Sequence, residues 1–121
     1  MKITIEKQIA FLQKVLRETE ANPHIWQRFP SNNVTVAEVF PDDELDSEGA
    51  FLFTDPKMKG EFWIAMCTNG RTKGAIGSSK DHMEFFDENS AEVKLLLTRI
   101  FYSVFDVWPS ASKLIDSYLA E

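Results

Sequence analysis

The sequence predicts an α+β fold. It should consist of an N-terminal helix, an antiparallel meander of three or four strands, and a long C-terminal helix plus a short last helix packed on one sheet face. Two observations lead to this prediction. Apolar residues recur at helical spacing near both ends of the chain. Between them, short apolar runs alternate with turn residues, as in consecutive antiparallel strands. The length of 121 residues is typical of one domain, so we expect a single domain over residues 1–121.

The first helix is predicted over residues 4–22. Its apolar stripe is formed by Ile5, Ile9, Leu12 and Leu16, widened by Phe11 and Val15. Pro23 ends the helix, because the residue before a proline is pushed out of the α region. Residues 22–33 are expected to form an irregular connector that brings Trp26 and Phe29 into the core.

Three apolar runs predict strands, at residues 34–40, 50–55 and 61–68. Asn69-Gly70 follows the third run and is a strong hairpin signal, because both residue types tolerate positive φ. The chain should reverse there into a weak fourth strand over residues 71–77. The state of residues 82–90 is left open.

A long helix is predicted from about residue 90 to 107, capped by Asn89 or Ser90. Trp108-Pro109 should break it, and Pro109 should begin a short last helix. Apolar residues occupy one half of the long helix and predict the face packed on the sheet: Val93, Leu96, Leu97, Ile100, Phe101, Val104, Phe105, Val107 and Trp108.

Leu95 and Tyr102 fall in the polar half of that helix. Either the last helix or the 22–33 connector covers them, or they form an exposed contact with a partner or a second copy. Both alternatives stay open at the level of sequence.

The net charge of −6, from 19 acidic and 13 basic residues, argues against a protein that binds the phosphate backbone of nucleic acid. Cys67 is the only cysteine, so no internal disulfide is possible and a reducing, cytoplasmic location is expected. No window approaches the ~20 apolar residues of a membrane span, so no membrane association is expected.

Five acidic residues without an intervening base form a group that could steer a basic protein partner: Asp42, Asp43, Glu44, Asp46 and Glu48. The spacing resembles the start of a calcium loop, but Ser47 and Phe53 stand where that loop needs glycine and glutamate. A solvated acidic loop is therefore favoured. A second acidic group lies further along the chain: Asp81, Glu84, Asp87, Glu88 and Glu92.

Residues 68–82 carry three glycines and three cations. The glycine spacing matches neither the P-loop nor the dinucleotide fingerprint, so a hairpin followed by a connector is favoured. The alternative is a loose anion site formed by Arg71, Lys73, Ser78, Ser79 and Lys80.

No catalytic residue, metal site or cofactor is predicted. A nucleophilic Cys67 would need His24 or His82 within hydrogen-bond reach, and nothing in the sequence places either one there.

These observations favour a small acidic protein-binding module that acts by occupying a partner's surface, as inhibitors, immunity proteins, adaptors and chaperones do. Leu95 and Tyr102 would be its apolar contacts, and a homodimer through the 90–107 helix is a further possibility. The alternative is a small enzyme or ligand-binding domain that uses residues 70–82 for an anionic ligand. A third reading is an acidic protein that imitates nucleic acid in the basic site of a nuclease.

Overall fold

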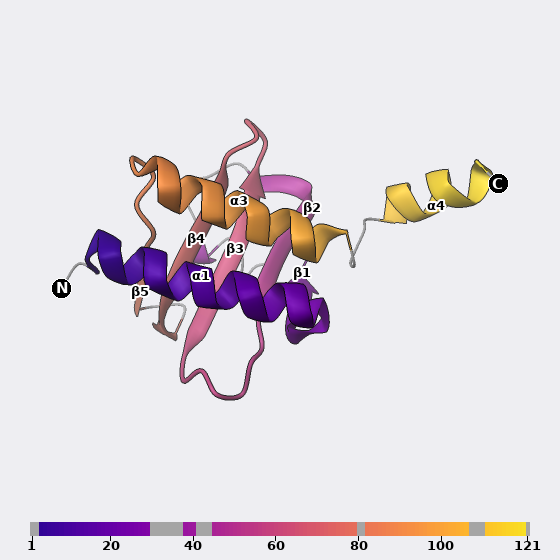
Figure 1. Cartoon of the computed structure of the whole chain (residues 1–121). Helices are drawn as coiled ribbons and strands as arrows, with labels where there is room; N and C mark the ends of the chain where they lie inside the picture. The colour runs from indigo at the N-terminus through magenta and orange to yellow at the C-terminus, as the bar shows by residue number, and fades with distance from the viewer. Residues whose placement is uncertain (1–2, 30–37, 41–44, 80–81, 107–110, 121) are drawn as a thin grey trace.

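The computed structural model describes residues 3–29, 38–40, 45–79, 82–106 and 111–120, without the side chains of residues 28–29, 45–48, 79 and 111–113. An antiparallel sheet with strand order β1-β2-β3-β4-β5 forms the middle of the fold. Helices α1 and α3 lie side by side across one face of this sheet and run in the same direction (Figure 1). The predicted α+β class is confirmed.

Both long helices begin at the residues that cap them. In α1 (Ile5–Ala21), the hydroxyl of Thr4 accepts a hydrogen bond from the Lys7 N–H, and a 3-10 turn (Pro23–Ile25) follows the helix. In α3 (Ala91–Phe105), the hydroxyl of Ser90 accepts one from the Val93 N–H at 3.3 Å. These side chains satisfy N–H groups that the first turn of a helix leaves without a partner.

The five strands are β1 (Trp26–Phe29), β2 (Leu45–Phe53), β3 (Glu61–Cys67), β4 (Thr72–Ser79) and β5 (His82–Phe85). The predicted reversal at Asn69-Gly70 joins β3 to β4. The N–H of Gly70 donates to the Cys67 carbonyl at 2.9 Å, and Gly70 has a φ of 85°. This is a three-residue loop closed by a glycine in the left-handed region, a conformation that glycine adopts without steric cost.

The sheet has two strands that were not predicted as such, so it is larger than the expected meander of three or four. They are β1 and β5, four residues each, at the two edges. β1 replaces part of the predicted irregular connector, although Trp26 does reach the core as expected. β2 begins at Leu45, inside the segment predicted as an acidic loop.

The strand predicted over residues 34–40 is wrong where it can be checked. Its described part, Glu38–Phe40, has a helical turn and a bend instead of strand backbone. Val39 and Phe40 are both buried, so two adjacent apolar side chains reach the same cluster, which the alternation of a strand does not allow. Residues 34–37 lie outside the described part of the chain.

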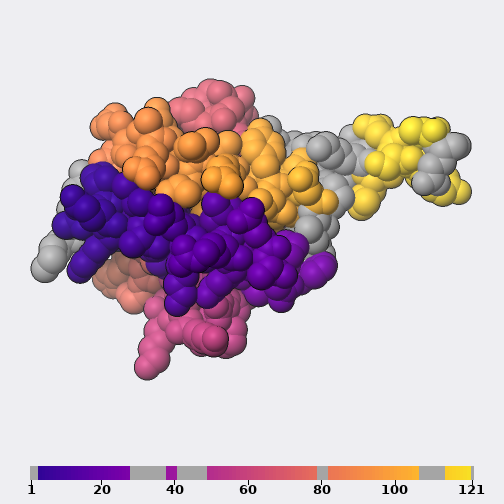
Figure 2. Space-filling model, viewed as in Figure 1, coloured from indigo at the N-terminus to yellow at the C-terminus, as the bar shows by residue number. Residues whose placement is uncertain are grey.

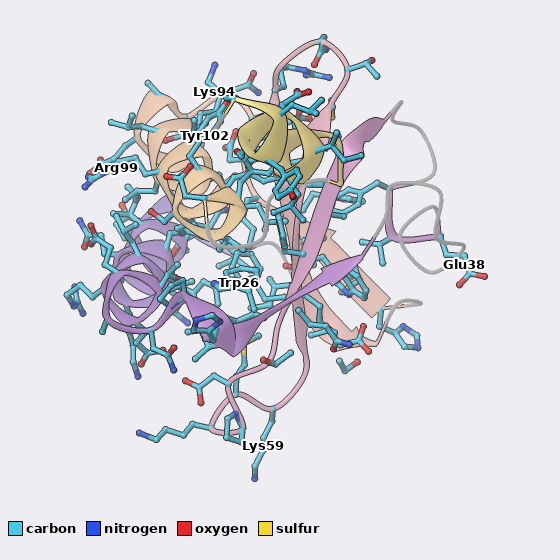
Figure 3. All side chains as sticks on the ribbon, turned by 90° about the vertical axis from the view of Figure 1, so that its right-hand side faces the viewer. Trp26, Glu38, Lys59, Lys94, Arg99 and Tyr102 are labelled. Atoms are coloured by element: carbon cyan, nitrogen blue, oxygen red, sulfur yellow. The ribbon has the colours of Figure 1, made fainter. Side chains whose placement is uncertain are left out.

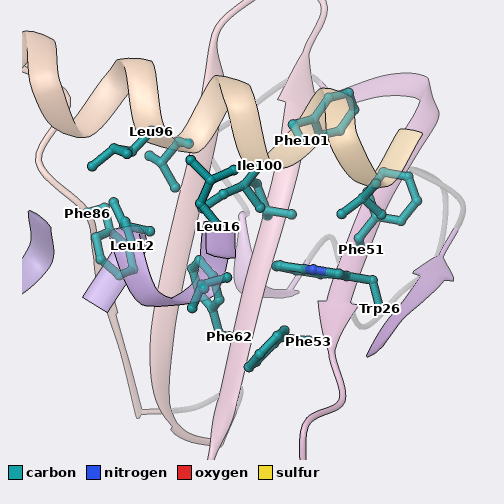
Figure 4. Close-up of a cluster of buried hydrophobic side chains, with 14 of the residues drawn as sticks. Leu12, Leu16, Trp26, Phe51, Phe53, Phe62, Phe86, Leu96, Ile100 and Phe101 are labelled. Carbon is teal, nitrogen blue, oxygen red and sulfur yellow. The ribbon is translucent and has the colours of Figure 1, made fainter. Parts of the chain in front are cut away.

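The main core lies between the two helices and the sheet (Figure 4). Leu12 and Leu16 of α1 meet Phe62 of β3, and the buried side chains of α3 match those predicted for its core face. A second cluster on the opposite face of the sheet includes Trp63 and Phe40. β3 is therefore covered on both faces, and its residues from Phe62 onwards are all buried.

Gly74 allows α3 to approach β4 closely. A Cβ atom at this position would lie 2.8 Å from the Cδ2 of Leu97, inside the contact distance of two carbons. The close approach brings the first two turns of α3, with Lys94 and Thr98, next to the start of β4. The candidate site described below lies at this junction.

The last helix, α4 (Ala111–Leu119), stands apart from the sheet and from the other helices (Figures 1 and 2). The side chains of residues 114–119 are exposed. A short last helix was predicted, but its packing on the sheet is not observed. α1 and α3 already cover that face of the sheet, which leaves α4 no apolar surface there.

Candidate functional site

A partly open hollow of about 200 Å³ lies where the β3–β4 turn, β4 and α3 meet. The turn at Gly70 places Arg71 directly before β4. In β4, Thr72 and Gly74 face α3, whereas Lys73 between them projects to the other face of the sheet, where its Nζ lies over the ring of Phe85. We call this cavity the cationic hollow. It is lined by Gly70, Arg71, Thr72, Lys73, Phe86, Glu88, Lys94, Leu97 and Thr98.

The carboxylate of Glu88 joins two of the cations in the hollow. Its Oε1 lies 3.0 Å from Nη1 of Arg71, and its Oε2 lies 3.5 Å from Nζ of Lys73. The Arg71 side chain is 52% exposed, whereas that of Lys73 is only 13% exposed. The Lys73 Nζ also lies 5.4 Å from the ring centroid of Phe85, within the range of a cation–π contact.

Two threonine hydroxyls complete the lining of the hollow. Thr98 Oγ1 of α3 and Thr72 Oγ1 of β4 are 3.5 Å apart, which is a long and weak hydrogen bond. A hydroxyl can rotate to donate to a ligand oxygen, so both groups remain adaptable.

A wider cavity of about 690 Å³ adjoins the cationic hollow and shares four of its residues, Arg71, Phe86, Glu88 and Lys94. Its remaining lining is Glu84, Phe85, Asp87 and Asn89. Phe85 is 45% exposed, which is unusual for a large aromatic side chain and gives this cavity an apolar wall.

A separate surface is apolar. Among the side chains that the structure describes, seven large apolar ones are exposed, and six of them belong to α3 or α4. We call these six the apolar surface: Leu95, Tyr102, Leu114, Ile115, Tyr118 and Leu119. Figure 3 shows Lys94, Arg99 and Tyr102 on the side of α3 that points away from Trp26 and the core.

Leu95 and Tyr102 are 59% and 51% exposed. As far as the structure describes them, neither the last helix nor the 22–33 connector covers this pair, so both side chains are accessible for a contact. Tyr102 also borders a small cavity of about 200 Å³ between α3 and the β3–β4 turn.

The five residues of the alternative anion site do not gather at one place. Arg71 and Lys73 line the cationic hollow, but Ser78 and Ser79 lie at the far end of β4. Arg71 and Ser78 are seven residue steps apart along extended backbone, or about 23 Å at 3.3 Å per step. Lys80 lies outside the described residues.

Sequence reasoning missed Lys94, Thr98 and Glu88 as members of this site. Lys94 and Thr98 are spaced i, i+4 on the polar half of a predicted helix, so the sequence does predict that they lie on the same face of that helix. Nothing in the sequence indicated that this face would meet Arg71.

The predicted acidic steering group is only partly described. Asp42, Asp43 and Glu44 lie outside the described residues, and Asp46 and Glu48 are described only as backbone in β2. Three members of the second acidic group do come together, because Glu84, Asp87 and Glu88 line the wider cavity.

Cys67 is buried at the end of β3, next to the β3–β4 turn. His82 pairs with Ser79 at the opposite end of β4, and His24 lies in the 3-10 turn after α1. Within the described residues, no group of three or more His, Cys, Asp or Glu side chains is placed to hold a metal ion.

No helix in the described ranges combines the length and the apolar character needed to cross a bilayer. Comparison of the chain with protein-family models, with curated proteins and with solved structures gives no match.

Proposed function

We propose that this protein is a protein-binding module that acts by occupying a partner's surface through the apolar surface of α3 and α4. The observation that supports it is the concentration of exposed large apolar side chains on these two helices. Exposed large apolar side chains bordered by charged residues are typical of interaction sites, and here they lie on two separate helices, each of which would contact the partner. Lys94 and Arg99 provide such a border on α3.

The exposed face of α4 gives the proposal its physical reason. A nine-residue helix is marginal in water without tertiary contacts. Burial of one Leu or Ile side chain contributes about 1.5–3 kcal/mol, so docking of Leu114, Ile115 and Leu119 against a partner would stabilise the helix and the complex together. Tyr118 adds an aromatic ring of the kind that is enriched at interface centres.

The net charge of −6 favours a basic partner, because complementary charge speeds association. The acidic residues 42–48 would contribute to this steering. We place the protein in the cytoplasm, since its single cysteine cannot form an internal disulfide. A second copy of the chain is an alternative partner for the same surface.

Two double variants test the proposal, Leu95→Glu with Tyr102→Glu, and Leu114→Glu with Tyr118→Glu. The control is Gln13→Glu, which adds a charge at an exposed position of α1. Tagged proteins are used for capture from lysate with quantitative mass spectrometry, and their molar mass is measured by light scattering. We expect a partner that both double variants lose by about tenfold or more and that the control retains, with unchanged circular dichroism.

A partner held equally by all variants would contradict the proposal. So would unfolding of the α3 variant, which would show that Leu95 and Tyr102 belong to the core. A dimer mass that both double variants reduce to a monomer would identify the second copy as the partner.

A further inference from the structure

We infer that the cationic hollow is a binding site for one oxyanion group, a phosphate or a carboxylate, of a small ligand whose apolar body lies in the adjoining wider cavity. This site is distinct from the apolar surface and does not depend on the proposed function. It draws on the described residues of three elements: the β3–β4 turn, β4 and the start of α3.

The cationic hollow is rich in positive charge, whereas the whole chain is negatively charged. Arg71 and Lys94 line a space of about 200 Å³, and Lys73 reaches the Glu88 carboxylate beside it from the other face of β4, in a protein of net charge −6. Cations that repel one another are held together best when an anion lies between them. A guanidinium, two ammonium groups and two hydroxyls are the donors that phosphate and carboxylate oxygens accept from.

Glu88 already shows how an oxyanion fits. Its two carboxylate oxygens meet Arg71 and Lys73 separately, at 3.0 and 3.5 Å, so the two cations are spaced for a group with at least two oxygens. The Glu88 side chain is 41% exposed and can turn outward to water without breaking the core. It therefore acts as an internal competitor that a ligand anion replaces.

The wider cavity indicates what the rest of the ligand is like. It is an open groove of about 690 Å³ that shares Arg71 and Lys94 with the hollow, and its volume is in the range of small-molecule sites. Its lining is mixed, with the rings of Phe85 and Phe86 beside the polar side chains of Glu84, Asp87 and Asn89. Phe85 is 45% exposed and offers the edge of its ring to a flat ligand ring, because the Lys73 Nζ lies 5.4 Å from its centroid and the Phe40 centroid lies 5.8 Å away. The ligand class is thus an aromatic or other flat apolar compound that carries one phosphate or carboxylate.

The test is a titration of the ¹⁵N-labelled protein with inorganic phosphate, phenyl phosphate and benzoate, followed by amide chemical shifts. We expect saturable shifts near residues 70–73, 86–88 and 94–98, with phenyl phosphate binding more tightly than inorganic phosphate. A stronger response to phenyl phosphate than to benzoate would identify a phosphate ligand, and the reverse a carboxylate ligand.

Four variants make the test specific. Arg71→Gln and Lys94→Gln each remove a cation and should weaken binding by about tenfold. Glu88→Gln removes the competing charge and should tighten binding several-fold. Phe85→Ala should weaken phenyl phosphate and benzoate but leave inorganic phosphate unchanged.

Lys59→Gln is the matched control, because this exposed lysine lies in the β2–β3 loop, away from the hollow. Equal weakening in this control, or absence of saturable shifts with all three probes, would overturn the inference. An unchanged affinity of Glu88→Gln would do the same, since it would show that Glu88 does not occupy the site. Arg71→Gln, Glu88→Gln and Phe85→Ala lie outside the apolar surface and its border and should not alter protein capture, so failure here and failure of the proposed function are separable.

Discussion

Thr19 links the first helix to the first strand through a single buried hydroxyl. Its Oγ1 donates to the carbonyl of Val15 at 2.7 Å and accepts from the indole N–H of Trp26 at 2.9 Å. Thr19 is fully buried and Trp26 nearly so, so water cannot replace this contact. The hydroxyl of this helical threonine thus serves mainly to hold the indole of Trp26 at the start of β1.

Thr19→Val should lower the free energy of unfolding by about 1–3 kcal/mol, because it leaves the Trp26 N–H buried without a partner. The measurement is urea denaturation followed by circular dichroism. The same substitution in a Trp26→Phe background should cost much less, since no indole N–H remains there. An equal loss in both backgrounds would mean that the hydrogen bond contributes nothing.

Residues whose role is local were predictable. Ser90 as a helix cap and Asn69-Gly70 as a turn follow from backbone chemistry within a few residues. Gln8 was not predictable, although it is buried: its Oε1 accepts from the N–H of Asp87, 79 residues away along the chain. Long-range polar contacts of this kind leave no trace in periodicity.

At the scale of elements, α4 is separable from the rest of the structure. Its described side chains are exposed, and Figure 2 shows it projecting from the body of the protein. A chain that ends at Ser110 should therefore keep its fold. Its melting temperature should shift by less than about 4 °C, the change that 1 kcal/mol makes in a domain of this size.

Thermal unfolding followed by circular dichroism and by calorimetry checks this expectation. The full-length Leu114→Glu, Tyr118→Glu variant is the control, because it removes the apolar face and keeps the helix length. A larger loss of stability on truncation would show that α4 packs against the body of the domain in solution.

Element length decided which parts of the fold could be predicted. α1, α3 and the long central strands have enough residues for a clear period, and each was expected. β1 and β5 have only four residues each, too few for an alternation to stand out. For residues 34–40 the error is the reverse, because a strand was predicted where the described part has none. Valines alternate with other residues in this run, but residues 38–40 form a helical turn and a bend.

Across the whole molecule, one sheet separates two buried clusters. Trp26 lies in the cluster under the helices, and Trp63 lies in the cluster on the other face. Both clusters share the backbone of β3, whose side chains alternate between them. This shared strand is the reason to expect a single cooperative domain.

The expectation can be measured with one tryptophan at a time. Trp63→Phe with Trp108→Phe leaves Trp26 as the reporter, and Trp26→Phe with Trp108→Phe leaves Trp63. Within each variant, urea curves from fluorescence and from circular dichroism should have the same midpoint, as two-state unfolding requires. An earlier fluorescence transition at Trp63 would show that the second cluster opens independently.

The candidate site is a property of the whole molecule, and for that reason the sequence predicted only part of it. Arg71 and Lys73 belonged to an anion site that the sequence offered only as an alternative, and there they were grouped with Ser78, Ser79 and Lys80, which are close to them in sequence. Their actual neighbours Lys94 and Thr98 belong to a helix that reaches them only because Gly74 has no side chain. Adjacency created by packing between elements is beyond what spacing along the chain reveals.

The packing of α1 beside α3 also has a consequence for biosynthesis. α1 ends at Ala21 and α3 begins at Ala91, so about 70 residues, or roughly 4 to 14 s of translation, separate the two. During that interval α1 has been synthesised but α3 has not, so the apolar face of α1 has no helix beside it. Leu12 and Leu16 of the nascent chain are therefore open to chaperones during this time, and the domain can close only when α3 has left the exit tunnel.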